Sequence, residues 1–173
     1  MSFEIRNENL TDKDDFGGVE LSDLVVIDST ALGTSFKEGQ YPHIKWVNTH
    51  SNNVSFQGSV LSGDFDSSSL KETSFKETEI PYLNLSNSTL KDCLFKQTKA
   101  SNLMLIGTRV ISTAILSSEF KDLDCSDSNC KFENVLFNGS VIKDDYLTGF
   151  FADHIELSQS KIQSSTFIFK NSS

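Results

Sequence analysis

The sequence predicts a solenoid, a fold in which each turn of the chain stacks on the one before it, and two periodicities predict it. Large apolar residues recur every 19 to 22 residues along most of the chain, at Phe16, Phe36, Phe56, Phe75, Phe95, Ile115, Phe137 and Leu157. A recurrence of this length is typical of a repeat fold that returns the chain to the same wall once per turn. A finer apolar period of five residues divides each interval into four. A period of five fits neither the α-helix nor the alternating β-strand.

The five-residue period sorts the apolar centres into four columns, of which the first is the set just given. We expect each column to line the inside of one wall, in nearly eight coils. The second column is Leu21, Tyr41, Leu61, Ile80, Ala100, Phe120, Ile142 and Ile162; the third is Val26, Trp46, Phe65, Leu85, Leu105, Cys125, Leu147 and Phe167; the fourth is Ala31, Ser51, Leu70, Leu90, Val110, Phe132 and Ala152. In the third column the residue two before the centre is often large, as at Leu83 and Leu103, which predicts a fatter wall.

The five-residue units also resemble a known family. Typical units are Thr73-Ser74-Phe75-Lys76-Glu77 and Cys93-Leu94-Phe95-Lys96-Gln97. They are similar to those of pentapeptide-repeat proteins, whose consensus has a small residue, then Asp, Asn or Thr, then Leu or Phe, then two polar residues. The resemblance covers about residues 16–169. It implies an all-β fold, a right-handed quadrilateral parallel β-helix of about eight coils, in which the central residue and the residue two before it point inward.

The repeat phase divides the chain into three parts. Residues 1–15 are polar and acidic and are either an N-terminal cap or a ragged first coil; residues 16–169 form the β-helix; residues 170–173 are a tail. Two phase breaks interrupt the helix. One residue is missing between Leu61 and Phe65, where Gly63 permits a tightened corner. Two residues are extra before Phe132, which predicts a small corner loop at 126–129 that either relieves strain or marks a binding face.

Charge limits the classes of partner. The 173 residues carry a net charge of −9, which argues against direct contact with nucleic acid or with an anionic membrane and leaves basic protein surfaces. The charge is uneven: residues 1–86 carry 14 acidic and 6 basic side chains, a net −8, and residues 87–173 carry 10 and 9, a net −1. With no signal peptide visible and three cysteines, we expect a cytoplasmic protein, or one secreted without a cleavable signal if it is an effector.

The residues argue against an enzyme. The histidines are His43, His50 and His154, and His43 and His50, which lie in one coil, have no cysteine or carboxylate at metal-ligand spacing beside them. The cysteines occupy or adjoin inward positions and are best interpreted as core thiols. The chain has no Gly-rich phosphate loop and no nucleophile or zinc motif. We therefore expect no catalytic residue, no metal and no cofactor.

The outward residues give the candidate interaction sites. An acidic cluster near the N-terminus is either a solubilising surface or a recognition surface for a basic partner. Exposed apolar residues near the C-terminus indicate either end-to-end association into a homodimer, which we favour, or a truncated chain. Lys71 and Lys91 should stack in adjacent coils, as should Lys76 and Lys96, with diagonal pairs such as Lys71 and Asp92 offsetting the repulsion. The candidates are Asp12, Asp14, Asp15, Glu20, Asp23, Asp28, Asp127, Phe151, Ile168 and Phe169.

Two functional hypotheses follow, both for a non-enzymatic rod that binds a protein. The resemblance implies, as the best-defined activity of the family, protection or inhibition of DNA gyrase and related type II topoisomerases by an acidic rod that mimics duplex DNA and dimerises through its C-terminal ends. The net charge and the apolar C-terminal end fit this activity. The N-terminal concentration of the charge, and the lack of a dimerisation helix and of a long loop, argue against it. The alternative is a bacterial effector or interaction module that docks a host or cellular protein.

Overall fold

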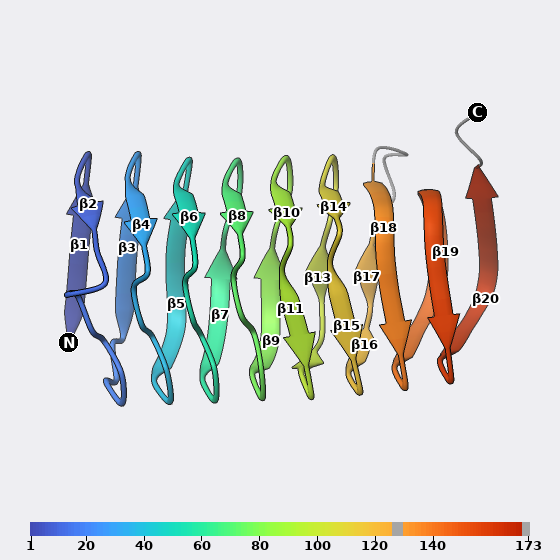
Figure 1. Cartoon of the computed structure of the whole chain (residues 1–173), viewed down its shortest axis with the longest axis horizontal. Helices are drawn as coiled ribbons and strands as arrows, with labels where there is room; N and C mark the ends of the chain where they lie inside the picture. The colour runs from blue at the N-terminus through green and yellow to red at the C-terminus, as the bar shows by residue number, and fades with distance from the viewer. Residues whose placement is uncertain (126–129, 171–173) are drawn as a thin grey trace.

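The computed structural model describes residues 1–125 and 130–170, and their side chains over 1–143 apart from that gap and over 153–163. These residues form strands and turns without any helix, so none of them belongs to a helix long and apolar enough to cross a membrane. Figure 1 shows a rod of stacked coils with the N-terminus at one end and the C-terminus at the other. The all-β solenoid predicted from the sequence is confirmed.

The strands are short over most of the chain and lengthen toward its C-terminus. They are β1 (Ser2–Arg6), β2 (Asn9–Leu10), β3 (Asp23–Ile27), β4 (Thr30–Leu32), β5 (Gln40–Val47), β6 (His50–Asn52), β7 (Val60–Asp64), β8 (Ser69–Lys71), β9 (Glu79–Asn84), β10 (Thr89–Lys91), β11 (Leu94–Lys96), β12 (Lys99–Ala100), β13 (Leu103–Met104), β14 (Arg109–Ile111), β15 (Ala114–Leu116), β16 (Glu119–Lys121), β17 (Leu123–Asp124), β18 (Cys130–Asn138), β19 (Val141–Ser158) and β20 (Lys161–Lys170).

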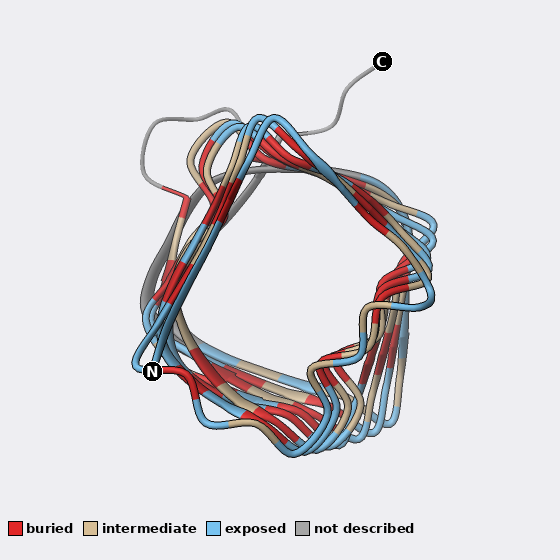
Figure 2. Cartoon of the chain, turned by 90° about the vertical axis from the view of Figure 1, so that its left-hand side faces the viewer, coloured by how far each residue is buried: buried red, intermediate tan, exposed pale blue. Residues whose placement is uncertain are grey.

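The strands pair in parallel with strands of the neighbouring coils, which makes a single continuous sheet. The partners are about 20 residues apart, as in Leu24 with Ile44 and Leu90 with Val110. Viewed along the rod, the coils superpose into a four-sided outline (Figure 2). The solenoid has about seven turns, so the sequence-based count of about eight is slightly high. The difference lies at the ends, where the chain covers only some of the four sides.

The five-residue period arises because a turn follows every short strand. The last residue of many units has a left-handed backbone, with φ of 56° at Glu77, 55° at Gln97 and 49° at Ser117. Such a conformation is what a tight turn demands, and short polar side chains tolerate it better than apolar or branched ones. Three extended residues and two turn residues therefore make one side of the coil.

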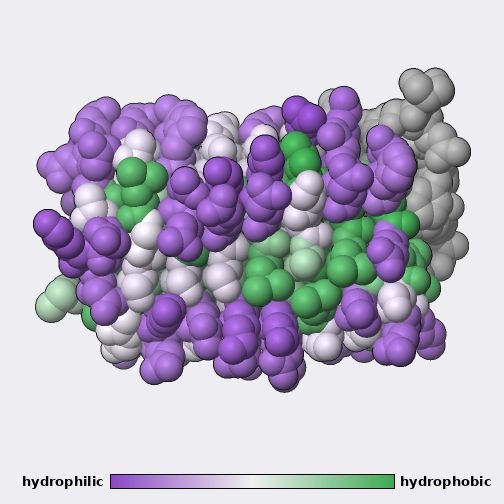
Figure 3. Space-filling model, in the orientation of Figure 1, coloured by the Kyte–Doolittle hydropathy of each residue, from purple (hydrophilic) through white to green (hydrophobic). Residues whose placement is uncertain are grey.

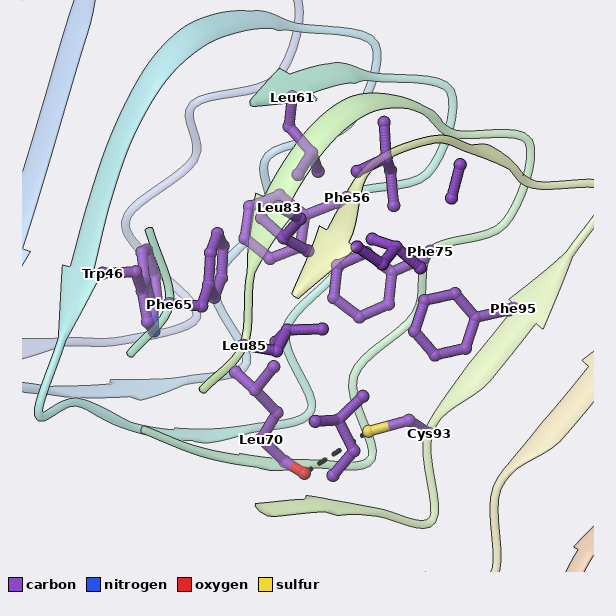
Figure 4. Close-up of a cluster of buried hydrophobic side chains, with 14 of the residues drawn as sticks. Trp46, Phe56, Leu61, Phe65, Leu70, Phe75, Leu83, Leu85, Cys93 and Phe95 are labelled. Atoms are coloured by element: carbon purple, nitrogen blue, oxygen red, sulfur yellow. Dashed lines mark hydrogen bonds between the residues drawn. The ribbon is translucent and has the colours of Figure 1, made fainter. Parts of the chain in front are cut away.

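Stacked rings fill the first column. The ring centroids of Phe36 and Phe56 are 5.1 Å apart, those of Phe56 and Phe75 are 5.5 Å apart, and those of Phe75 and Phe95 are 4.7 Å apart, and the planes of each pair are nearly parallel. Trp46 stacks in the same way on Phe65, at 5.7 Å. Figure 4 shows the rings and leucines of neighbouring coils meeting in the interior. The predicted inward columns are thus confirmed through this part of the chain.

The small inward residues link one coil to the next. Ser88 Oγ donates to the carbonyl oxygen of Phe65 at 2.6 Å, Thr108 Oγ1 to that of Leu85 at 2.6 Å, and Ser140 Oγ to that of Ile115 at 2.9 Å. A buried hydroxyl without a partner would cost about 1–3 kcal/mol. The hydrogen bonds between coils remove that cost and explain why Ser and Thr recur at this position.

The missing residue before Phe65 changes the wall at Gly63, as predicted. The backbone there has a φ of 147°, and a Cβ at this position would lie 2.1 Å from the carbonyl oxygen of Ile44. The pairing of β5 with β7 slips between Tyr41 and Ile44 to absorb the shorter coil. Only glycine fits this close approach, which draws the chain inward at this coil.

Leu157, which the sequence places in the first inward column, is exposed, while Phe16 and Ile162 are partly buried. Leu157 continues the first column in register with Phe137, but 47% of it is exposed. The strand segment that holds it pairs with β18 on one side, while β20 pairs with β19 only up to Phe151. Among the described residues no strand covers Leu157 on its other side, and its assignment to the buried core was wrong.

The core also becomes looser toward the C-terminal half. A wholly apolar cavity of about 40 Å³ lies among aliphatic and aromatic side chains from Leu85 onward. Its lining includes Val110, Ile115 and Phe120. Smaller side chains replace the stacked rings there and leave this space.

Candidate functional site

Apolar core side chains line the interior, including its small cavity, so a functional site is expected on the outer walls. Among the described residues, no group of three or more His, Cys, Asp or Glu could hold a metal ion. Cys93 and Cys130 are buried, and their thiols point at the carbonyl oxygens of Leu70 and Leu105, at 3.3 and 2.7 Å. Burial raises the pKa of the Cys93 thiol to about 11. The predicted core thiols are confirmed, and they are poor nucleophiles.

The acidic residues of the N-terminal coils surround the rod instead of forming one patch. Asp14 caps the turn after β2, where its Oδ2 accepts the amide hydrogen of Thr11 at 2.8 Å. Asp15 and Glu20 lie on successive sides, bridged to Ser35 and Gln40 of the next coil. Asp12 lies in the same turn as Asp14.

The other two predicted carboxylates lie further along the same coils. Asp28 occupies a left-handed corner after β3, and its Oδ1 accepts a hydrogen bond from Asn48 Nδ2 at 2.6 Å. Asp23 begins β3 and lies on the rim of a groove. Asp28 lines a smaller hollow with Asn48 and His50, whereas the groove of Asp23 also contains aromatic side chains.

The groove runs along the rod across the coils of β1, β3, β5, β7 and β9, with a volume of about 740 Å³. It exists because the coil at Gly63 is one residue short, which sinks that part of the wall. Phe3 and Tyr82 lie at its two ends, Phe3 in the first of these coils and Tyr82 in the last. They are 38% and 37% exposed. Its lining is Ser2, Phe3, Glu4, Asp23, Val25, Pro42, His43, Ile44, Lys45, Ser62, Gly63, Asp64 and Tyr82.

Carboxylates dominate the electrostatics of the groove. Asp23 accepts hydrogen bonds from the hydroxyls of Ser2 at 2.9 Å and Ser22 at 3.2 Å, and these bonds lower its pKa. His43 Nδ1 is 3.7 Å from Asp23 Oδ1. Asp64 accepts from Asn84 Nδ2 at 3.2 Å. These bonds hold the two carboxylates in fixed positions.

Tyr82 supplies an aromatic face beside these charges. Burial, and then the negative charge of Asp64, raise the pKa of its hydroxyl, which therefore stays protonated at neutral pH. Three carboxylates line the groove, counting Glu4, against one lysine, Lys45, and His43. An aromatic ring next to carboxylates is the arrangement that favours a guanidinium or ammonium group. The groove is therefore suited to a basic side chain.

The remaining predicted sites cannot be placed. Asp127 lies outside the described residues. Phe151, Ile168 and Phe169 lie in β19 and β20, in stretches where the structure describes the backbone alone. The C-terminal association therefore remains a prediction.

The lysine stacks lie where the sequence placed them, but with other ion pairs. Lys71 is in register with Lys91, and Lys76 precedes Glu77, whose amide bonds to the carbonyl oxygen of Lys96. Lys71 Nζ is 3.1 Å from Glu72 and Lys76 Nζ is 3.2 Å from Glu77. Lys71 and Lys76 thus pair with their own sequence neighbours, and the predicted diagonal ion pair between Lys71 and Asp92 does not form. The left-handed corner residue turns its carboxylate back toward the preceding lysine.

Comparison with known proteins agrees with this architecture. No protein-family model matches the sequence, and no curated protein sequence matches it. Among solved structures, a trypsin-treated form of QnrB1, a plasmid-mediated fluoroquinolone resistance protein, superposes with a TM-score of 0.50 at 14% identity over 92% of this chain and 84% of QnrB1. HetL, a pentapeptide-repeat protein involved in heterocyst differentiation regulation in the cyanobacterium Nostoc, gives a TM-score of 0.36 at 13% identity over 94% of this chain and 86% of HetL.

This chain has the pentapeptide-repeat fold. The likeness to QnrB1 is one of fold, since an identity of 14% carries no residue-level correspondence. Within the pentapeptide-repeat fold, side chains on the outer walls are free to vary because only the inward positions are required for packing.

Sequence reasoning found Asp23 but missed the rest of the groove. Glu4, Asp64 and Tyr82 come from coils far apart in the sequence, and nothing local marks them as neighbours. The available signal was the missing residue at Gly63 together with the 20-residue arithmetic, which places Asp64 beside Lys45 and Asn84.

Proposed function

We propose that this chain is a non-enzymatic protein-binding solenoid that holds a basic segment of a partner protein against its acidic N-terminal coils. The observation that carries the proposal is the groove between Phe3 and Tyr82, which combines fixed carboxylates with exposed aromatic rings. Protein-binding grooves use such rings as rigid contact surfaces and use charge to select the partner.

The distribution of charge supports a partner at this end of the rod. The net charge of residues 1–86 is −8, from 14 acidic and 6 basic side chains. A basic partner would approach the N-terminal coils faster than the rest of the surface, because long-range attraction steers association. The groove would then provide short-range selection of an arginine or lysine side chain.

A type II topoisomerase is the specific partner that we propose to test first. The fold likeness to QnrB1, a plasmid-mediated fluoroquinolone resistance protein, is the observation that favours it. In this chain a DNA-like acidic surface would be confined to the first coils, since Lys71, Lys91, Lys76 and Lys96 line a wall further along. The second hypothesis from the sequence is an effector. An effector would use the same acidic surface to bind a basic segment of a host or cellular protein.

The basic-segment proposal is tested by fluorescence anisotropy with labelled nona-arginine. We expect saturable binding that Asp23→Lys and Tyr82→Ala each weaken about tenfold, a factor equal to about 1.4 kcal/mol. The matched control is Glu79→Lys, which makes the same charge change at an exposed position outside the groove. Equal losses from Asp23→Lys and Glu79→Lys would mean non-specific attraction and would refute the groove.

The topoisomerase is tested separately with purified gyrase. We expect the chain to inhibit supercoiling, or to protect gyrase from a quinolone, at micromolar concentration, and we expect Asp23→Lys to lose the effect while Glu79→Lys keeps it. Neither inhibition nor protection by the wild-type chain would exclude this partner and leave the anisotropy result unaffected.

A further inference from the structure

We propose that the interior of the rod between Leu85 and Ile142 is a binding site for a small apolar molecule, of about the size of a xenon atom. The site is the apolar cavity of about 40 Å³ in the C-terminal half. The proposal is independent of the groove between Phe3 and Tyr82, which lies on the outside of the first coils. It rests on the space in the core, on the chemistry of its lining and on the apolar wall outside it.

The space exists because two columns lose their aromatic rings in the same coil. The first column changes from Phe95 to Ile115 before it returns to Phe137. The third column has Leu105 where Phe65 stood two coils earlier. Strand pairing fixes the distance between coils, so the backbone does not contract around the smaller side chains and a void is left between them.

The exposed fractions of the inward side chains also reveal this space. Ile115 and Leu105 are each 5% exposed, whereas Phe75 and Phe65, two coils earlier in the same columns, are 0% exposed. Because all four side chains point into the rod, the difference reflects room inside the coil.

The lining selects an apolar occupant. In the described part of the chain every lining residue is apolar. The nearest inward hydroxyls are already used between coils, as Thr108 Oγ1 donates to the carbonyl oxygen of Leu85 at 2.6 Å. A buried water needs about three polar partners, so an apolar cavity without them stays dry. An apolar molecule needs no such partner and gains dispersion contacts with side chains that the void leaves unopposed.

The volume limits the ligand to very few atoms. A water molecule needs about 10–15 Å³, and an engineered apolar cavity of about 150 Å³ binds benzene. The cavity in this chain, at about 40 Å³, lies between these two values. It therefore suits a single xenon atom or a diatomic gas such as dioxygen and excludes an aromatic ring.

An apolar outer wall lies next to the cavity. Leu94, Ala114 and Leu136 form a ladder of outward residues in register on β11, β15 and β18, and each is partly exposed. The next residue of each strand points inward and lines the cavity. Figure 3 shows apolar surface gathered around β11 and β15, while the coils nearer the N-terminus are mainly hydrophilic on the same face. An apolar molecule thus meets apolar surface on both sides of this wall, and local opening of the short strands suffices for entry.

Methyl NMR of the folded chain under increasing xenon pressure tests the site. We expect saturable chemical-shift changes at the methyl groups of Val110, Ile115 and Leu105, which line the cavity. The methyl groups of Val26 are the internal control, because this residue is fully buried in the first half, and their shifts should not change. No response in the wild-type chain would overturn the proposal, and so would equal responses at Val110 and Val26.

Two variants that fill the cavity should remove the response. Ile115→Phe places a ring between Phe95 and Phe137, so it continues the first column in its own pattern and should abolish binding. Val110→Ile is a milder change that adds one methylene and should weaken binding about tenfold. Val47→Ile adds the same methylene at a partly exposed outward position of β5 and should leave binding unchanged. Undiminished binding in both filling variants would contradict the site.

A variant that enlarges the cavity tests the size of the ligand. Leu105→Ala removes most of a lining side chain, so the space should then admit benzene. Benzene should raise the thermal midpoint of Leu105→Ala, because a ligand that binds the folded chain stabilises it. It should leave the midpoint of the wild-type chain unchanged. A benzene response of equal size in both chains would refute the size limit.

Discussion

The two halves of the rod share one backbone design but differ in what fills it. From Leu24 to Leu85 the buried apolar side chains are 0–1% exposed, and from Leu90 to Ile142 most are 2–8% exposed. In the first half, rings stack on rings in successive coils. In the second half, Ile115 and Leu105 stand where the rings of the first and third columns would have continued, and the cavity of about 40 Å³ lies beside them. The fold therefore tolerates a looser core, because hydrogen bonds between coils hold the walls in register.

The outer surface also changes between the two halves, near residue 90. The ladder that carries Ser35, Ser55 and Ser74 becomes Leu94, Ala114 and Leu136, and the net charge of −8 over residues 1–86 falls to −1 over residues 87–173. The half with the less tightly packed interior thus also presents apolar side chains on its outer surface. Such area on a surface is typical of an interaction site.

The largest difference between the halves should appear on truncating equivalent phenylalanines. Phe56 contacts four rings with centroids within 5.9 Å, and Phe95 contacts two within 5.6 Å. We expect Phe56→Ala to lower the free energy of unfolding by about 5 kcal/mol and Phe95→Ala by about 3 kcal/mol. Urea denaturation of both variants measures the difference, and equal losses would mean that ring stacking does not distinguish the halves.

A second test asks whether the looser half still excludes water. Burial raises the pKa of the Cys93 thiol from its usual 9.0 to about 11. Because the folded pKa lies above the unfolded one, the buried thiol contributes full stability below about pH 9, and the contribution is lost as the pH rises through 11.

We therefore expect the wild-type chain to lose about 1–2 kcal/mol more than Cys93→Ala between pH 8 and pH 10.5. Denaturation at the two pH values measures this, with the variant as the reference for every other group that titrates. The native thiol should also resist alkylation at pH 8. Rapid labelling of the folded chain would show that water reaches the core beside the cavity.

The smallest expected effect comes from adding one methylene to each half. Val110 lines the cavity, while Val26 is fully buried in the first half. Val110→Ile should fill space and stabilise the chain by about 0.5–1 kcal/mol, and Val26→Ile should overpack the core and destabilise it by about 1 kcal/mol. Thermal unfolding of both variants measures whether each substitution raises or lowers stability. A stability change in the same direction in both variants would contradict the difference in packing.

Some of the outer surface could have been predicted from the sequence. The stacking of Lys71 on Lys91 follows from 20-residue arithmetic, but the same ladder continues to Glu133 and Asp153 with a step of 22 residues across the insertion at 126–129. The change from lysines to carboxylates along this ladder therefore becomes visible only when the register is known. The groove was hidden for a related reason, since its depth comes from one deleted residue and its lining from five coils.

The sequence alone determined the architecture. Each five-residue unit carries its own turn and its own inward residues, so the periodicity specifies the coil, the four columns and the place of the Gly63 break without any long-range information. The tertiary structure decided what depends on contacts between coils or on the absence of a neighbour. These features include the exposure of Leu157, which no described strand covers, the pairing of Lys71 with Glu72 and the cavity beside Val110. The groove in which Phe3, Asp23, Asp64 and Tyr82 meet is another such feature.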